Sequence, residues 1–249
     1  MERDDILNVQ ESQELTDAAK NAQSTFRYFW RELYWERRRI VPALDLACVK
    51  IEFRQEDPPN APMAEFMWIT NIDFDGTHVS GHLISTPGIL TNIKNGDFVK
   101  VAADEINDWL FATRARAYGG FTIQAIRAQM SEKDRKSHDE AWGLDFGSPT
   151  NVLLAYQQEE HPENLIEHPM SINMKESLIE FLSQHPDEIT KKDPHGYTML
   201  HREAIAGNKT CAEVLIQMGA DAATKTAEGL TPADLAKKMG WEHMAHIFA

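Results

Sequence analysis

The C-terminal part of the chain repeats itself at a fixed interval. A Gly-x-Thr sequence at 196–198 returns at 229–231, and Gly207 returns as Gly240. A fixed period of about 33 residues is typical of stacked helical units, none of which can bury its apolar face alone. Such a stack needs about three units to bury a continuous core, and only two are obvious here.

Shifting back by one period uncovers a degenerate third unit. The apolar residues of 178–182 align with those of 211–215, which are 33 residues later, although the turn signals are missing. We therefore expect residues 171–249 to form a short all-α repeat domain of about three units, with the degenerate first unit as its N-terminal cap.

The first 150 residues have a different pattern. Apolar side chains recur every three or four residues from Glu14 to Arg39, which predicts an amphipathic helix. Four β-rich stretches follow, and Asp75-Gly76 and Asn95-Gly96 supply hairpin-turn signals between them. The four expected strands are 46–54, 65–72, 78–86 and 98–102, and the proline-rich stretch 57–62 is an expected loop.

Beyond these strands we expect two further helices. Residues 104–111 are interpreted as a short helix or turn, and Thr122 as the cap of a helix that runs to about Arg135. Helix, antiparallel strands and helix in this order predict an α+β domain over residues 14–150. Residues 151–170 contain two prolines and an acidic run, which indicates a junction between domains.

Several motifs of residues 14–150 occur in a fixed order. They are Met67-Trp68, Asp75-Gly76, Gly81 with Leu83, Pro87, Gly96-Asp97-x-Val99, Ile106-x-Asp108-Trp109 and Gly119-Gly120-Phe121-Thr122. This order resembles the YegJ-like bacterial domain of unknown function, over about Phe26 to Gly147. The resemblance supplies no catalytic residues that could be transferred.

The repeat region resembles ankyrin repeats. The matching positions are Asp193, Gly196, Thr198, Leu200, His201, Ala204, Gly207 and Gly219-Ala220-Asp221, then Gly229, Thr231, Pro232, Leu235, Ala236 and Gly240. Met199, Glu203 and Asp234 depart from the family pattern. The resemblance implies β-turn tips and paired helices that bind proteins, with looser packing where Asp234 replaces the usual histidine.

The chain is acidic throughout, with a formal net charge of −14 over 249 residues. A surface of this sign disfavours direct nucleic-acid binding, because phosphates require basic groups, whereas it would attract a basic partner. No apolar run approaches the roughly 18 residues of a membrane span, and the acidic start lacks the pattern of a signal peptide. Cys48 and Cys211, far apart in apolar surroundings, are interpreted as reduced core residues of a cytoplasmic protein.

No catalytic constellation emerges from the sequence. His78 and His82 would lie about 13 Å apart on a strand, too far to share one metal ion. The carboxylates of Asp104, Glu105 and Asp108 are equally compatible with the first turn of a helix. Phosphate-binding loops, nucleophile elbows and dinucleotide fingerprints are all missing. We therefore expect no catalytic, cofactor-binding or metal-binding residues, and a protein that is not an enzyme.

Acidic and aromatic residues with expected exposure are the candidates for partner binding. Because Tyr34 and Trp35 fall on different faces of one helix, one of them should be exposed, and we select Trp35. The full set of candidate contacts is Trp35, Asp73, Asp75, Asp139, Glu140, Glu159, Glu160 and Glu203.

A YegJ-like domain joined to a short ankyrin region resembles the immunity proteins of bacterial type VI secretion systems. That resemblance implies binding and neutralisation of a cognate secreted toxin, a basic nuclease. Two alternatives stay open: an ankyrin adaptor or scaffold with another protein partner, and an enzyme whose site the motifs do not reveal.

Overall fold

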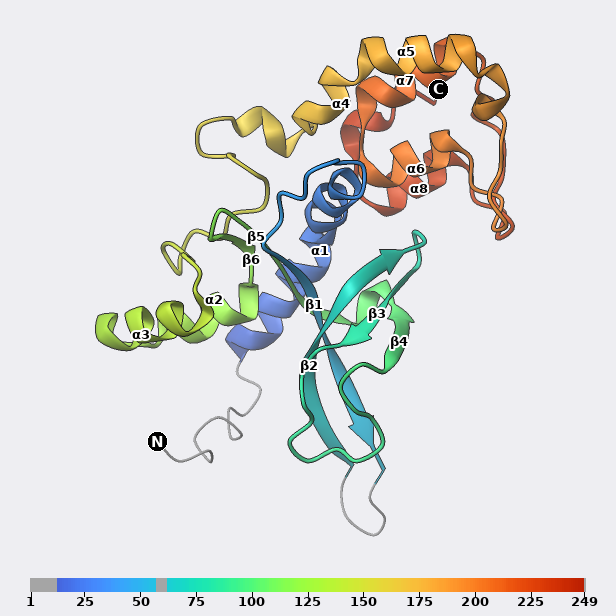
Figure 1. Cartoon of the computed structure of the whole chain (residues 1–249). Coiled ribbons are helices and arrows are strands. Elements are labelled where there is room, and N and C mark those ends of the chain that lie inside the picture. The colour runs from blue at the N-terminus through green and yellow to red at the C-terminus, as the bar shows by residue number, and fades with distance from the viewer. Residues whose placement is uncertain (1–12, 57–61, 249) are drawn as a thin grey trace. The chain divides into compact units, whose positions relative to one another are not determined.

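The computed structural model describes residues 13–56 and 62–248, which divide into two compact units (Figure 1). Residues 13–29 and 41–154 form the sheet unit, whereas residues 30–40 and 155–248 form the helical unit. The division therefore falls inside helix α1 (Gln13–Glu36), and the C-terminal part of this helix, from Trp30 onwards, belongs to the helical unit. The sequence offers no sign of this split. Most of the expected loop 57–62 lies outside the described residues.

The sheet unit is built on a six-stranded sheet with the order β4-β3-β2-β1-β5-β6, in which all neighbours pair antiparallel. The strands are β1 (Leu46–Gln55), β2 (Met63–Phe74), β3 (His78–Leu83), β4 (Phe98–Ala102), β5 (Ile106–Thr113) and β6 (Arg116–Gly119). The Asp75-Gly76 turn joins β2 to β3, as predicted, and Gly76 has the positive φ that the turn requires. The expected antiparallel sheet with packed helices is confirmed.

Helices cover the sheet on two faces near β5. On one face, the indole of Trp109 packs against Phe29 of α1 and donates a hydrogen bond from Nε1 to the carbonyl of Ala22, 2.9 Å away. On the other face, Leu110 lies in a core with Ile123 of helix α2 (Phe121–Ala128) and with Cys48 and Phe146. Successive residues of a strand point to opposite faces, so β5 carries two cores at once.

Two predictions for residues 104–135 are wrong. Only Ala103–Glu105 form a 3₁₀ turn (η2), and the residues from Ile106 onwards form strand β5, which is buried almost throughout. A strand covered on both faces lacks the polar–apolar alternation by which strands are recognised. The expected second helix is two helices, α2 and α3 (Glu132–Trp142), and Ser131 caps the latter by accepting a hydrogen bond from the backbone N–H of Asp134.

The helical unit consists of short helices in two layers (Figure 1). Helices α4 and α5 contact α7, and α6 contacts α7 and α8. The elements are η3 (Pro162–Leu165), α4 (Pro169–Asn173), α5 (Lys175–Gln184), η4 (Pro186–Ile189), α6 (Met199–Ala206), α7 (Lys209–Gln217), α8 (Pro232–Lys238) and η5 (Glu242–Met244). The short turn η5 directly follows Trp241.

The repeat in the sequence corresponds to two equivalent turns that lie side by side. Gly196 and Gly229 have φ values of 81° and 82°, and the N–H of Ala227 donates to the carbonyl of His195 across the two turns, at 2.9 Å. In the first turn, His201 contacts Thr198 through Nδ1 and the carbonyl of Thr224 through Nε2. His201 therefore links the first turn to the segment that leads into the second.

In the second turn, Asp234 takes the place of the histidine. Its carboxylate accepts hydrogen bonds from the N–H and the hydroxyl of Thr231, so it caps α8 locally.

Cys48 and Cys211 are buried free thiols, as predicted, and burial raises the pKa of Cys211 to about 12.

Candidate functional site

The prediction that Trp35 is exposed is wrong. Its side chain is 1% exposed, and Tyr34 beside it is also buried. The Trp35 indole stacks on the ring of His168, and its Nε1 donates to Oδ1 of Asn208 at 3.0 Å. Both faces of this end of α1 are covered by the helical unit to which it belongs, so Trp35 is a core residue and not a partner contact.

Glu203 is likewise not on the surface, because it is 1% exposed. Its Oε1 accepts hydrogen bonds from the Tyr34 hydroxyl at 2.7 Å and from Nη2 of Arg38 at 2.9 Å. Its Oε2 accepts one from Nδ2 of Asn208 at 2.7 Å. Burial and the neighbouring Glu203 carboxylate raise the pKa of Tyr34, so the hydroxyl remains a donor. Sequence reasoning missed this network because bonded partners such as Tyr34 and Glu203 are 169 residues apart.

A second set of buried polar contacts joins α1 to the segment before α4. Nη1 of Arg31 donates to the carbonyl of Ile166 at 3.2 Å, and Nη2 donates to that of Asn164. Nε2 of His168 lies 3.2 Å from Oε2 of Glu32. Burial lowers the pKa of His168, even though Glu32 favours its charged form. These contacts hold residues 164–168 in one conformation.

Asp73 and Asp75 lie at the β2–β3 turn of the sheet unit. Asp73 is an exposed residue of β2, whereas Asp75 accepts hydrogen bonds from the N–H groups of Thr77 and His78 and an ion pair from Lys100. Burial opposes the ionisation of Asp75, but these donors outweigh it and hold the pKa of Asp75 well below its usual range. The Asp75 carboxylate is thus engaged in forming the turn.

Asp139 and Glu140 are on α3. The Asp139 carboxylate accepts two hydrogen bonds from the buried guanidinium of Arg127, at 2.8 and 2.6 Å, and therefore anchors α3 to α2. Glu140 is exposed on the outer side of the same helix, near Lys136. Of this pair, only Glu140 presents its charge fully to solvent.

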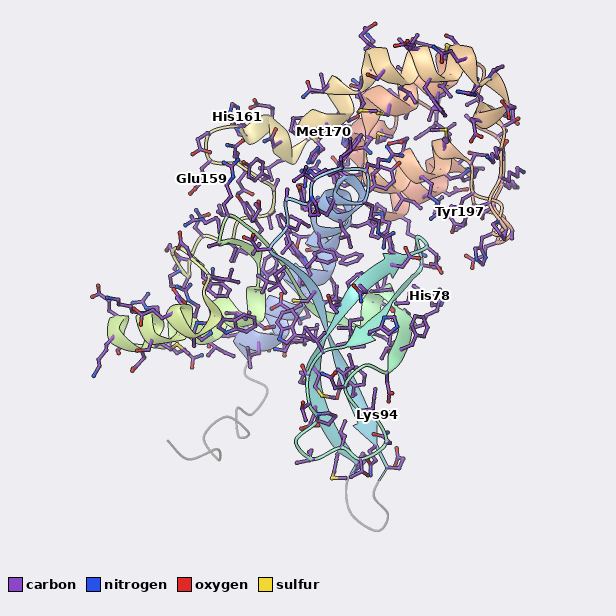
Figure 2. The ribbon with its side chains drawn as sticks, viewed as in Figure 1. His78, Lys94, Glu159, His161, Met170 and Tyr197 are labelled. Atoms are coloured by element: carbon purple, nitrogen blue, oxygen red, sulfur yellow. The ribbon has the colours of Figure 1, made fainter. Side chains whose placement is uncertain are left out.

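Glu159 and Glu160 are exposed in the segment that precedes η3. Figure 2 shows Glu159 near His161 in the same stretch of chain. The eight predicted contacts therefore do not form one site. Trp35 and Glu203 are buried in the helical unit, and four others belong to the sheet unit. Of the eight, Glu159 and Glu160 are the exposed residues of the helical unit.

A groove of about 420 Å³ lies within the helical unit, and the residues that line it fall between Gln157 and Ile172. Ile166 and Ile172 line it and are 58% and 53% exposed, so the groove presents two large apolar side chains to solvent. Glu163 and Glu167 also line it. We predicted that residues 151–170 form a junction between domains. Apolar residues interspersed with several glutamates, without lysine or arginine, are the signal that could have identified the groove.

The sheet unit contains one cluster that resembles catalytic chemistry. The Thr122 hydroxyl donates to Oδ2 of Asp108 at 2.5 Å, and Lys50 Nζ lies 3.1 Å from the same hydroxyl. The backbone N–H groups of Trp109, Phe121 and Thr122 also donate to Asp108, so this carboxylate caps α2, and Thr122 is not the cap. Because Thr122 and Asp108 are almost completely buried, no substrate reaches them in this arrangement.

Among the residues that the structure describes, no group of three or more His, Cys, Asp and Glu side chains could hold a metal ion. Within the same ranges, none of the helices is both long and apolar enough to cross a membrane.

Comparisons with known proteins find one matching family and two relatives of this chain. Residues 12–146 match the family described as uncharacterized protein conserved in bacteria (DUF2314). A relative named "Putative ankyrin repeat protein NMB1133/NMB1171" from Neisseria meningitidis serogroup B is 48% identical over 243 residues, which are 97% of this chain and 96% of the relative. The uncharacterized protein YegJ of Escherichia coli K12 is 31% identical over 62 residues, 25% of this chain and 40% of YegJ.

No solved structure gives a significant match. The DUF2314 match covers more than half of the chain, and the similarity to the Neisseria relative covers nearly all of it. The resemblance of the first domain to YegJ is thus confirmed, and the chain belongs to the bacterial DUF2314 family.

Proposed function

We propose that this protein acts by binding another protein, and that it is an immunity protein which neutralises a cognate bacterial toxin. The toxin is a basic nuclease effector of a type VI secretion system, encountered in the cytoplasm where nucleic acid lies. The protein itself performs no chemistry and needs no cofactor in this role.

The observation that carries the proposal is the acidic, partly apolar groove of the helical unit. Nuclease surfaces that grip phosphates are basic, so an acidic inhibitor associates with them quickly and competes with nucleic acid. The name of the Neisseria relative supports the protein-binding role, because ankyrin repeats are binding modules. The two side-by-side turns at Gly196 and Gly229 are compatible with an ankyrin architecture.

Co-expression with the product of the neighbouring gene tests the proposal. We expect the full-length protein to relieve the toxicity of that product and to form a stable complex with it. The association rate should fall steeply as the salt concentration rises, whereas the dissociation rate should change less. Toxicity that persists at equal expression levels would contradict the immunity role, and salt-independent association would contradict its electrostatic part.

An adaptor role is the second candidate, favoured by the name of the Neisseria relative, which refers to ankyrin repeats. An adaptor would bind a partner without altering the growth of cells that express the neighbouring gene. The same co-expression experiment therefore separates the two roles.

A further inference from the structure

The groove that contains Ile166 and Ile172 is suited to a particular kind of partner segment. We infer that it binds a basic amphipathic segment of a partner protein, with a large apolar side chain between the two isoleucines and lysine or arginine side chains at the glutamates around it. This inference rests on the proposed protein-binding function and specifies its surface.

The first argument is that the groove keeps its apolar residues exposed on a fixed frame. The carbonyls of Asn164 and Ile166 accept hydrogen bonds from the buried Arg31 guanidinium. The Asn164 side chain donates to the carbonyl of Tyr156 at 2.8 Å. A segment anchored in this way loses little conformational entropy on binding, which favours affinity.

Glu167 fixes the part of the groove that α4 contributes. Its Oε1 accepts hydrogen bonds from the Ser171 hydroxyl and from the N–H of Thr210 at the start of α7, both at 2.6 Å. The α4 helix that carries Ile172 is thereby tied to α7. Ile166 and Ile172 therefore remain at the surface even though a core lies close by, and exposed apolar residues that line a concave site are typical of binding surfaces.

The second argument is charge. Residues 155–174 contain four glutamates, Glu159, Glu160, Glu163 and Glu167, and no lysine or arginine. Two of them, Glu163 and Glu167, line the groove beside His161 and form its acidic rim. The Arg31 cation that contacts this segment is buried, and its guanidinium is turned to backbone carbonyls. A basic segment is thus complementary to this rim, whereas a second copy of this chain, with its net charge of −14, would be repelled.

A designed peptide tests the groove directly. The probe is a fluorescent amphipathic helical peptide of leucine and lysine with one apolar face, and its binding to the full-length protein is followed by fluorescence anisotropy. Two control peptides have glutamate in place of lysine, or serine in place of leucine. We expect the probe to bind and both controls to bind at least about tenfold more weakly.

Matched variants locate the binding. The double variant Ile166→Ser/Ile172→Ser should weaken binding about tenfold or more, because each isoleucine loses part of an apolar contact. Phe181→Ser, an exposed apolar residue of α5 outside the groove, should leave it unchanged. Glu163→Lys should weaken binding more than Glu228→Lys, which changes the net charge equally at an exposed loop residue. Circular dichroism verifies that all variants fold.

The outcomes are distinct. Equal binding by the wild type and the double serine variant would overturn the inference, as would equal losses with Glu163→Lys and Glu228→Lys. If the neighbouring gene product is neutralised by the serine variant as well as by the wild type, the groove is wrong and the immunity role stands. If the peptide binds in the groove but the gene product does not bind, the groove stands and the immunity role fails.

Discussion

The two units each bury a carboxylate, but they compensate it in different ways. In the sheet unit, Asp108 is held by donors only 1 to 14 residues away: three backbone N–H groups, two of them at the start of α2, and the Thr122 hydroxyl. In the helical unit, Glu203 is held by Tyr34 and Arg38 of the N-terminal segment, 169 and 165 residues away. One unit completes its polar core locally, and the other needs a distant piece of chain.

The segment 30–40 contributes Trp35 to the core of the helical unit and Arg31 to its polar contacts, so this unit depends on a packing element from the N-terminal part of the chain. We therefore expect changes in α1 after Trp30 to affect the helical unit, whereas changes in β5 should affect the sheet unit.

Trp35→Ala should have the strongest effect on stability. Removing this indole from the core should lower the free energy of unfolding by about 3–5 kcal/mol, as is usual for buried aromatic residues. Hydrogen exchange should accelerate mainly in residues 155–248. Trp109→Ala, its counterpart in the sheet unit, should accelerate exchange mainly in residues 41–154. Equal acceleration in both units by either variant would contradict the contrast between them.

A somewhat smaller effect is expected from Arg38→Met, which leaves the Glu203 carboxylate buried without its cation. We expect a loss of about 2 kcal/mol, less than for a fully buried pair because Arg38 is partly exposed. Adding Glu203→Gln should recover part of this loss, since the unpaired charge is then removed. Denaturant unfolding of the two single variants and the double variant measures the coupling. Strict additivity would show that the ion pair is not the compensating contact.

Acidification should weaken the helical unit first. Burial lowers the pKa of His168, His201 and His243, all in this unit. Because the unfolded chain takes up protons below about pH 6.5 and the folded unit does not, their contribution is present above this pH and is lost as the pH falls towards the lower folded values. For His168 alone the slope is at most about 1.4 kcal/mol per pH unit.

The measurement is amide exchange between pH 7.5 and 5.5, corrected for the intrinsic pH dependence of exchange. Protection in residues 155–248 should decrease more than in residues 41–154. His168→Gln, which does not titrate, should flatten the decrease. An unchanged pH profile in this variant would exclude His168 as a source of the sensitivity.

The weakest effects are expected at two turns, one in each unit, in which an aspartate accepts similar hydrogen bonds. Asp75 in the sheet unit and Asp193 in the helical unit both accept N–H groups of the following residues and an ion pair from a base. These contacts outweigh burial and lower the pKa of both carboxylates, so their stabilisation is fully present above about pH 4 and is lost progressively as the pH falls towards the lower folded values. Asp75→Asn and Asp193→Asn should each cost about 1 kcal/mol or less at pH 7. Thermal melts at pH 7 and pH 3 would show whether the difference begins to shrink in acid.

Much of the fold could be predicted from local patterns. The long first helix, four of the strands and the Asp75-Gly76 turn follow from periodicity and turn chemistry, and each was found close to its expected position. Strand β5 was missed because it is buried on both faces and shows no alternation. The candidate contacts were less predictable, since exposure depends on what packs against a residue and not on its type.

Local sequence alone encodes the repeat period, the turns that Gly196 and Gly229 form, and the antiparallel arrangement of the first strands. These features depend on contacts between residues close in the chain, so composition and spacing are sufficient to specify them. The burial of Trp35 and Glu203 emerged only from tertiary packing, because a buried carboxylate is recognisable only when its donors are seen beside it. The same holds for the groove at Ile166 and Ile172, because its backbone is held in part by Arg31, which is 135 residues away from Ile166 in the sequence.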